Sequence, residues 1–329
     1  MTPILWGAAV FLVIIAGYEV WLKMQPTYDG ETVSDWVNAA CETQSTLNYT
    51  DQIPAIGAPA VPYLIAKLKT RDSGFYGTYT NLLEHTPEAV GKHLPQFDDP
   101  EAVRQRAAEC LGELGPIAKP AIPQLTQSMR GAALIEQVDL ATAIWKINGD
   151  TNLILQTCHA ALTQSTNDTA LFWGVFTLCD MGPAATPEVP ALLPLLTNPK
   201  LKPNRRYLVA RALGRINCKS DAVIAALQEG MKNPSLTLSL LCAQSLWKLD
   251  NQYARAALTT IVARAVEANR RDPKERVKML TLLDSGDGDN FFITNSIPIL
   301  KELQQSDDAD VRQFVSEALQ EIAVKSKTP

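Results

Sequence analysis

The stretch that decides the fold is "RAAECLGELGPIAKPAIPQL", which runs from Arg106 to Leu125. Its first half has the composition of a helix, and that helix is expected to stop at Gly115. Glycine readily adopts the left-handed conformation that ends a helix, and proline is tolerated in the first turn of the next one. After Pro116, Pro120 and Pro123 the chain enters a second apolar run. The stretch therefore predicts two helices joined by a tight turn.

The same kind of break recurs along the chain at steps of 33 to 37 residues. The residues expected to follow each helix end are Gly115, Asn148, Gly182, Asn217, Asp250, Gly286 and Ala323. Most of these are Gly, Asn or Asp, which tolerate the left-handed conformation. A fixed period of this length indicates stacked copies of one helical unit. We therefore predict an all-α fold, an α-solenoid of about seven or eight helical hairpins.

Apolar positions before each break support this period. In each predicted hairpin, leucine or isoleucine stands three residues before the last residue of the first helix, as at Leu111 and Leu213. The residue six positions before that last residue is small in most of the hairpins. Such spacing lines one face of a helix, and small residues allow a neighbouring helix to approach closely. Trp145 and Trp247 occupy one column of the repeat. We interpret them as packing between repeats rather than as a ligand-stacking pair.

The segment "RQRAAECLGELGPIAKPAIPQL", from Arg104 to Leu125, resembles a HEAT repeat of the short bacterial type. The residues that carry the resemblance are Ala107, Ala108, Leu111, Gly112, Leu114, Gly115, Pro116, Ala121, Pro123 and Leu125. "MGPAATPEVPALLPLL" (Met181 to Leu196) is also similar, and the likeness weakens after Ile216. Members of this family often carry an N-terminal membrane anchor followed by a segment like "YDGETVSDWV" (Tyr28 to Val37). The resemblance implies HEAT-type hairpins and a binding role, and no reaction.

These patterns divide the chain into three parts. Residues 1–24 are predicted to be an N-terminal membrane anchor or signal sequence, residues 25–31 a linker, and residues 32–329 the solenoid with an insertion at about 70–98. The first helix of the array is expected from Thr32 to Gln44, with Val33, Trp36, Val37 and Ala40 on one face. Asp307 or Asp308 is expected to start the last helix.

The N-terminal stretch predicts a transmembrane helix. Residues 4–22 are apolar apart from Glu19, which falls near one end, and they are just long enough to cross a bilayer. Trp6, Tyr18 and Trp21 lie near the two ends, where aromatic side chains favour the interface. A cleaved signal peptide is the rival interpretation, weakened by the lack of a basic start and of an A-x-A site. The positive charge of Lys23, taken alone, would keep the rest of the chain in the cytoplasm. Most short N-terminal anchors instead export the chain that follows them. We therefore expect an uncleaved anchor, with the helical part of the chain in the periplasm.

Composition narrows the classes of partner. A formal net charge of -5 and an isoelectric point near 5.4 argue against a nucleic-acid-binding protein, which normally carries a basic face. The six cysteines are far apart and form no zinc-binding spacing. We predict that they are small buried hydrophobic residues, although an even number leaves disulfides possible in an exported protein.

No catalytic, cofactor-binding or metal-binding residues are predicted. Asp284, Asp287 and Asp289 suggest a calcium loop, but the twelfth position of that loop is Asn295, where an EF-hand needs glutamate. We interpret the loop as solvated. His85, His93 and His159 lack the spacing of a metal site, and no motif marks a nucleophile, although sequence alone leaves a Cys-His pair open.

The favoured function is a non-catalytic, membrane-tethered scaffold for protein–protein interaction, for example an accessory subunit or assembly factor of a membrane complex. It predicts exposed aromatic or charged side chains on the second helices of the hairpins. The alternative is a HEAT-like lyase or chaperone that holds a tetrapyrrole or another ligand in the concave groove, because bilin lyases contain similar repeats. That alternative predicts a groove of ligand size with a carboxylate or tyrosine facing into it.

Overall fold

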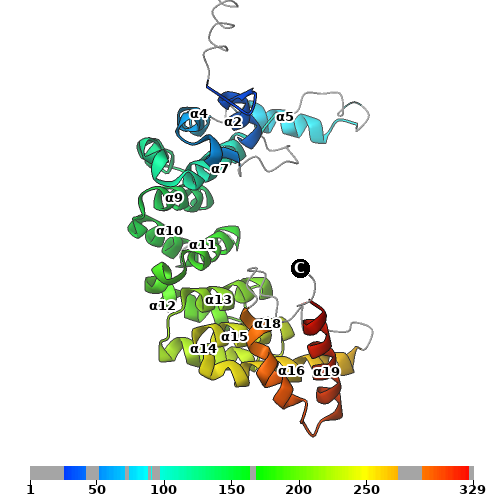
Figure 1. The fold of residues 1–329 in the computed structure, drawn as a ribbon. Coiled ribbons are helices and arrows are strands. Elements are labelled where there is room, and N and C mark those ends of the chain that lie inside the picture. The colour runs from blue at the N-terminus through cyan, green and yellow to red at the C-terminus, as the bar shows by residue number, and fades with distance from the viewer. Residues whose placement is uncertain are drawn as a thin grey trace, which may run out of the picture. The chain divides into compact units, whose positions relative to one another are not determined.

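The computed structural model describes residues 26–41, 52–70, 74–87, 90, 97–163, 168–272 and 291–325. These residues are almost entirely helical, so the all-α prediction is confirmed (Figure 1). The chain divides into two compact units, Met1–Thr157 (unit 1) and Cys158–Pro329 (unit 2).

The elements of unit 1 are β1 (Thr27–Tyr28), β2 (Glu31–Thr32), α2 (Val33–Cys41), α3 (Ile53–Ile56), η2 (Ala58–Ala60), α4 (Val61–Leu68), α5 (Phe75–Glu84), α7 (Pro100–Glu113), η3 (Gly115–Ala121), α8 (Ile122–Ser128) and α9 (Leu134–Asn148). Helix α10 (Thr151–Thr163) contains the boundary between the units. Unit 2 continues with α11 (Asp168–Met181), η4 (Gly182–Glu188), α12 (Val189–Thr197), α13 (Pro203–Ile216), α14 (Asp221–Met231), α15 (Leu236–Leu249), η5 (Asn251–Tyr253), α16 (Ala254–Arg271), α18 (Phe291–Leu303) and α19 (Ala309–Lys325). The labels η2 to η5 denote 3₁₀ helices.

Most of the segment predicted to be a linker is a β-hairpin. Strands β1 and β2 pair antiparallel, and Asp29 and Gly30 between them both have positive φ, as a two-residue hairpin turn requires. The Trp36 indole N–H donates to the Tyr28 carbonyl oxygen at 2.8 Å. The hairpin is thereby fixed to α2. The buried residues of α2 include Val33, Val37 and Ala40, as predicted.

Several predicted helix ends are confirmed by the backbone. Gly115, Gly182 and Asn217 have φ of 58°, 57° and 57°, in the left-handed region. Between the helices of two pairs, however, a 3₁₀ helix intervenes, η3 before α8 and η4 before α12. Pro123 and Pro190 then lie in the first turns of the second helices, where a proline breaks no hydrogen bond.

Other predicted breaks agree only in part. Helix α9 includes Asn148, and its C-cap is Gly149, which has a φ of 76°. Helix α15 ends at Leu249 as predicted, but Asp250 is extended rather than left-handed, and its carboxylate accepts a hydrogen bond from the Gln252 backbone N–H at 3.0 Å. Helix α19 runs through Ala323 to Lys325. Gly286 lies outside the described residues.

The core of unit 1 is formed by α2, α4, α7 and α9, with α8 packed on α9. Each of α4 and α9 contacts α7, so helices that lie two or three elements apart in the sequence are neighbours in space. Gly112 of α7 allows this approach, because a Cβ there would lie 3.3 Å from the Ala143 Cα atom of α9. Gly112 belongs to the same column of the repeat as Trp145 and Trp247, and at this position the column lies at a helix–helix contact.

In unit 2, helices α11, α13 and α15 pack side by side in this order, and α12 contacts α14 (Figure 1). Gly214 of α13 meets Ser245 of α15, whose hydroxyl donates to the Ala210 carbonyl oxygen at 2.8 Å. Trp247 is fully buried and packs edge-on against Phe292 of α18, with ring centroids 5.2 Å apart. Its predicted packing role is confirmed, whereas Trp145 is only half-buried.

The helices predicted to be the first and the last both begin at the expected cap residues. Thr32 precedes α2, and its side-chain oxygen accepts a hydrogen bond from the Asp35 backbone N–H at 3.2 Å. Asp308 precedes α19, and its carboxylate accepts from the Asp310 N–H at 2.9 Å. Both are standard helix N-caps. The described part of the first helix ends at Cys41, short of the predicted Gln44.

The prediction that the cysteines are buried hydrophobic residues is confirmed for five of the six. All six are free thiols, and only Cys218 is partly exposed. Burial raises the pKa of Cys41 to about 11 and the pKa of Cys242 to about 12. These thiols therefore stay protonated and unreactive near neutral pH.

Within the described ranges, no helix combines the length and the apolar character that crossing a bilayer requires. The predicted anchor, residues 1–24, lies outside those ranges, as do residues 42–51 and the acidic loop around Asp287.

Candidate protein-binding site

Three aromatic side chains lie together on the outer face of α11 in unit 2. The ring centroids of Phe172 and Trp173 are 5.2 Å apart, those of Trp173 and Phe176 are 5.6 Å apart, and those of Phe172 and Phe176 are 6.0 Å apart. Phe176 is 38% exposed, and the other two are half-buried. We call Phe172, Trp173 and Phe176 the α11 aromatic patch.

The sequence of α11 explains why these rings face outward. The opposite face is apolar and fully packed, with Leu171, Val175 and Leu178 buried. Gly174 brings this face against α10, since a Cβ at Gly174 would lie 2.9 Å from the Ala161 Cβ atom. With the inner face filled, residues 172, 173 and 176 occupy the remaining side of the helix. The aromatic patch is therefore held by a rigid support.

An arginine from the neighbouring helix completes the patch. The Arg205 guanidinium of α13 lies 4.7 Å from the centroid of the Phe172 ring, a cation–π contact. It also donates from Nε and Nη2 to the two carboxylate oxygens of Asp168, at 3.1 and 2.7 Å. These hydrogen bonds, with another from Lys202 at 2.9 Å, lower the pKa of the Asp168 carboxyl. The two hydrogen bonds to Asp168 fix the Arg205 guanidinium over the Phe172 ring.

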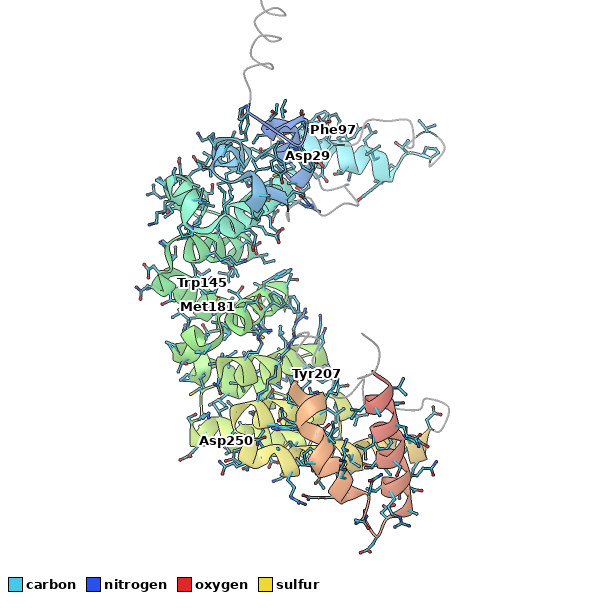
Figure 2. The ribbon with its side chains drawn as sticks, in the orientation of Figure 1. Asp29, Phe97, Trp145, Met181, Tyr207 and Asp250 are labelled. Carbon is cyan, nitrogen blue, oxygen red and sulfur yellow. The ribbon has the colours of Figure 1, made fainter. Side chains whose placement is uncertain are left out.

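A separate group of basic side chains lies along α13 and α15. Arg211 and Arg215 of α13 and Lys248 of α15 line a shallow depression together with Phe292. The Lys248 ammonium lies 5.5 Å from the centroid of the Phe292 ring. Figure 2 labels Tyr207, whose hydroxyl lies 2.9 Å from the Ser235 hydroxyl and joins α13 to the start of α15.

The arrangement is suited to binding rather than to bond chemistry. Aromatic residues and arginine are enriched at the centres of protein–protein interfaces, where they contribute most of the binding energy. Among the described residues no group of three metal-binding side chains is found. His159 pairs with Glu188 at 2.8 Å beside Cys158, but burial, with a smaller contribution from Glu188, raises the pKa of that thiol to about 12. A Cys-His nucleophile does not form there.

The other sequence candidates do not converge on this patch. The His85 ring nitrogen Nδ1 lies 2.7 Å from the Asn81 carbonyl oxygen within α5, a local contact. His93 and Asp284, Asp287 and Asp289 lie outside the described residues. Comparison with known proteins adds no assignment: no family model matches the chain, and no curated protein is significantly similar to it.

The patch was not predicted from the sequence, because exposed aromatic residues were expected on the second helices of the hairpins. Helix α11 is instead the first helix of its pair. The signal was present in "LFWGVF" (Leu171 to Phe176), where the three aromatic residues fall on one side of a helix. A search for aromatic residues opposite the buried face would have found them.

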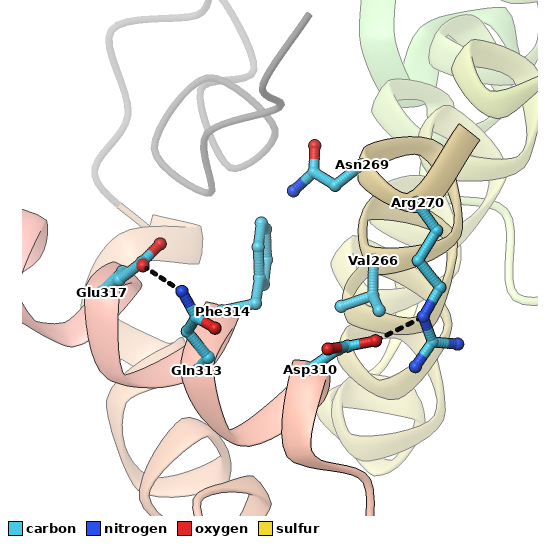
Figure 3. A pocket seen from close by; sticks show the side chains of 7 residues that line it. All are labelled: Val266, Asn269, Arg270, Asp310, Gln313, Phe314 and Glu317. Carbon is cyan, nitrogen blue, oxygen red and sulfur yellow. Dashed lines mark hydrogen bonds and ion pairs between the residues drawn. The ribbon is translucent and has the colours of Figure 1, made fainter. Parts of the chain in front are cut away.

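Two larger cavities have the size of a ligand site. A cleft of about 370 Å³ between α16 and α19 has Val266 and Phe314 among its lining residues, and the Arg270 Nε atom is paired with Asp310 at 2.5 Å (Figure 3). Gln313 donates to Glu317 at 3.1 Å along α19, on one wall of the same cleft. Its polar groups therefore satisfy each other rather than converging on a ligand.

The second cavity, of about 780 Å³, lies among α4, α7, α8 and α9 in unit 1 and is mostly polar. Arg104 spans it, donating to the Thr70 carbonyl oxygen at 3.1 Å and to Glu136 at 2.9 Å. This arginine joins three elements and has a structural role. Neither cavity has the enclosed apolar lining that a tetrapyrrole would need.

One acidic side chain in unit 1 makes stability depend on pH. Burial, followed by the charges of Glu109 and Glu136, raises the pKa of Asp139 in α9 from 3.8 to about 7. Because the folded pKa is the higher one, the folded chain holds the proton more tightly than the unfolded chain. Stability is then greatest below pH 3.8 as far as this group is concerned, and it falls as the pH rises to about 7.

We expect Asp139→Asn to raise the free energy of unfolding at pH 8 by about 1–3 kcal/mol, because the amide removes a charge held in a poorly solvated place. At pH 3 the wild-type carboxyl is protonated in both the folded and the unfolded chain, so the variant and the wild type should melt at nearly the same temperature. Thermal unfolding at the two pH values measures the difference. An equal shift at both values would contradict the raised pKa.

Proposed function

We propose that the chain is a non-catalytic, membrane-tethered scaffold that binds a protein partner through the α11 aromatic patch. Its architecture is proposed to be an α-solenoid of about seven or eight HEAT-type hairpins behind an anchor at residues 1–24. The observation that carries the proposal is the set of three clustered aromatic rings with Arg205 fixed above one of them.

Contacts that join residues one period apart support the solenoid. Lys146 pairs with Glu113 at 2.6 Å across 33 positions, and Lys202 pairs with Asp168 at 2.9 Å across 34. The Ser245 hydroxyl reaches the Ala210 carbonyl across 35 positions. These separations equal the period of the predicted breaks. Residues one period apart are therefore in contact, which is the pattern expected of a stacked array.

The patch itself supports a protein partner. Rigid aromatic side chains offer a large contact area with little loss of conformational entropy on binding. Phe176 exposes enough of its ring to enter a pocket on a partner, while the half-buried Phe172 and Trp173 support it. Arg205 is held in place before binding, so little ordering cost remains. The patch has the composition and the preorganisation of a binding hot spot.

The test is a pull-down of the tagged, full-length protein from its native membrane in mild detergent, with mass spectrometry of the recovered proteins. The patch variant is Trp173→Ser/Phe176→Ser. Loss of a hot spot costs about 2–4 kcal/mol, so recovery of the true partner should fall by roughly 30-fold or more. Both side chains lie on the outer face of α11, so the variant should keep its circular dichroism spectrum.

The matched control is Ile117→Ser, which removes another exposed apolar side chain (51% exposed) from η3 in unit 1. This variant should recover the partner as the wild type does. Equal recovery of every membrane protein by the patch variant and the wild type would exclude the patch as the binding site. Recovery of no stoichiometric partner by the wild type would reject the scaffold function.

The side of the membrane is a separate part of the proposal. We propose that residues 4–22 span the bilayer and that the helical body lies in the periplasm. Protease added to intact spheroplasts should then digest the body. A body that is cleaved only after the membrane is broken would place it in the cytoplasm.

A further inference from the structure

A second exposed apolar surface lies in the insertion of unit 1. Of the seven large hydrophobic side chains that are exposed among the described residues, four lie between residues 75 and 97. They are Phe75, Leu82, Val90 and Phe97, which are 54%, 59%, 52% and 45% exposed. Single exposed apolar residues are ordinary, whereas such a concentration marks a contact surface. We call Phe75, Tyr79, Leu82 and Phe97 the α5 surface.

Helix α5 is held by its own aromatic cluster rather than by the core. None of its ten residues is buried. The Phe75 and Tyr79 rings stack with centroids 5.6 Å apart, and Phe97 packs edge-on against both at 5.4 and 5.0 Å. Phe97 lies three residues before α7 begins at Pro100. The rings therefore connect an otherwise uncovered helix to the body of unit 1.

The polar groups of α5 are suited to a weakly hydrated environment. The Thr78 and Thr80 hydroxyls donate to the carbonyl oxygens of Gly74 and Tyr76 at 2.9 and 3.0 Å. The Thr86 hydroxyl, just past the helix, donates to the Leu82 carbonyl oxygen at 2.7 Å. A hydroxyl that is already bonded loses less free energy when water is removed. The helix thus reduces the cost of leaving bulk water.

Charge argues against an electrostatic partner. Residues 74–87 and 97–99 contain no lysine or arginine, and their acids are Glu84, Asp98 and Asp99. The α5 surface has nothing to attract phosphate or an acidic protein. Phenylalanine, tyrosine and leucine among neutral polar residues are instead typical of a segment at the membrane–water interface.

The position of the surface in the chain supports the same partner. Only three residues separate Leu22, at the end of the predicted span, from Pro26, so Pro26 can lie no more than about 14 Å from the span even if they are fully extended. Figure 2 shows Asp29, in the hairpin turn after Pro26, and Phe97 toward the same end of unit 1. We infer that the α5 surface enters the headgroup region of the bilayer that anchors the chain. The inference rests on the proposed membrane tether.

The test places a fluorophore on the surface of the full-length protein. Leu82→Cys, labelled with bimane, is reconstituted into phosphatidylethanolamine–phosphatidylglycerol vesicles with and without a headgroup-proximal doxyl lipid. An interfacial helix inserts about 5–10 Å, so the doxyl lipid should reduce bimane emission by roughly half. The matched control is Ile117→Cys, an exposed apolar position in the same unit, whose emission should not change. Labelled wild type gives the background from the native cysteines, of which only Cys218 is partly exposed.

The outcomes separate the surface from the tether. Quenching at position 82 and not at position 117 supports the inference, and it should persist in phosphatidylcholine vesicles because no basic residue is involved. Co-flotation of the protein with the vesicles but no quenching at position 82, or equal quenching at both positions, overturns the inference and leaves the tether intact. If wild-type protein does not float with the vesicles, the tether fails and the inference fails with it.

Discussion

Replacing Leu213 with aspartate is expected to unfold the helices of unit 2 in one cooperative transition. Leu213 is fully buried in α13, which packs against both α11 and α15. A carboxylate at this place would lose its hydration and leave the space of the leucine poorly filled. The expected loss exceeds about 4 kcal/mol, a large part of the stability of an ordinary domain. Thermal unfolding followed by far-ultraviolet circular dichroism measures it.

The control for this substitution lies on the same helix. Asn204→Asp introduces the same carboxylate at an exposed position in the first turn of α13, where a negative charge is favourable. Its melting temperature should stay close to that of the wild type. If Leu213→Asp also melted like the wild type, Leu213 could not be a core residue, and the assignment of the repeat would be wrong.

Gly214→Ala is expected to destabilise the chain although it adds only a single methyl group. The new Cβ would lie 2.6 Å from the Ser245 Oγ atom and 2.9 Å from its Cα atom. Part of this clash is with the backbone of α15, so α13 and α15 have to separate. Overpacking of this kind costs roughly 1–3 kcal/mol, more than the gain from the better helix propensity of alanine. The midpoint of urea unfolding gives the loss.

Two further variants test this explanation. Gly77→Ala adds the same methyl group in α5, where nothing lies within 4 Å, and should stabilise that helix slightly. Ser245→Gly removes the Cβ and Oγ atoms of the opposing residue, so the double variant should recover part of the stability lost in Gly214→Ala. The double-mutant cycle should give a coupling of about 1 kcal/mol or more. Strictly additive effects would show that the two residues are not in contact.

The helical class could be predicted because several helix ends are marked by residues that tolerate the left-handed backbone. Gly115, Gly182 and Asn217 adopt the left-handed backbone that was expected of them. Asp250 does not, because an aspartate can also act as an N-cap, and here it caps η5. A single sequence does not distinguish these two roles of aspartate. The short 3₁₀ helices η3 and η4 were missed for a related reason, since Pro-rich turns are compatible with both a direct restart and an intervening turn.

The candidate site was harder to predict than the fold. A sequence period reveals the residues that repeat, whereas the α11 aromatic patch occurs once. The insertion was recognised by its departure from the period, but its composition did not reveal that Phe75, Tyr79 and Phe97 would form a cluster. That cluster depends on a contact between residues about 20 positions apart, which no local pattern encodes. Both candidate binding surfaces, the α11 aromatic patch and the α5 surface, are thus formed by residues that do not recur with the period.

The close helix contacts also bear on how this sequence can change over evolution. Gly112 meets Ala143, and Gly214 meets Ser245, and in both pairs the partners lie 31 positions apart. A larger residue on one side of such a pair would be tolerated only with a smaller one on the other, so we expect the two positions to covary in related sequences. Insertion of a few residues between the two partners of such a pair would change their separation in the sequence and bring different residues into contact. In the proposed solenoid, gain or loss of a whole period would preserve these contacts, so duplication of complete hairpins is the expected way for such a chain to change length.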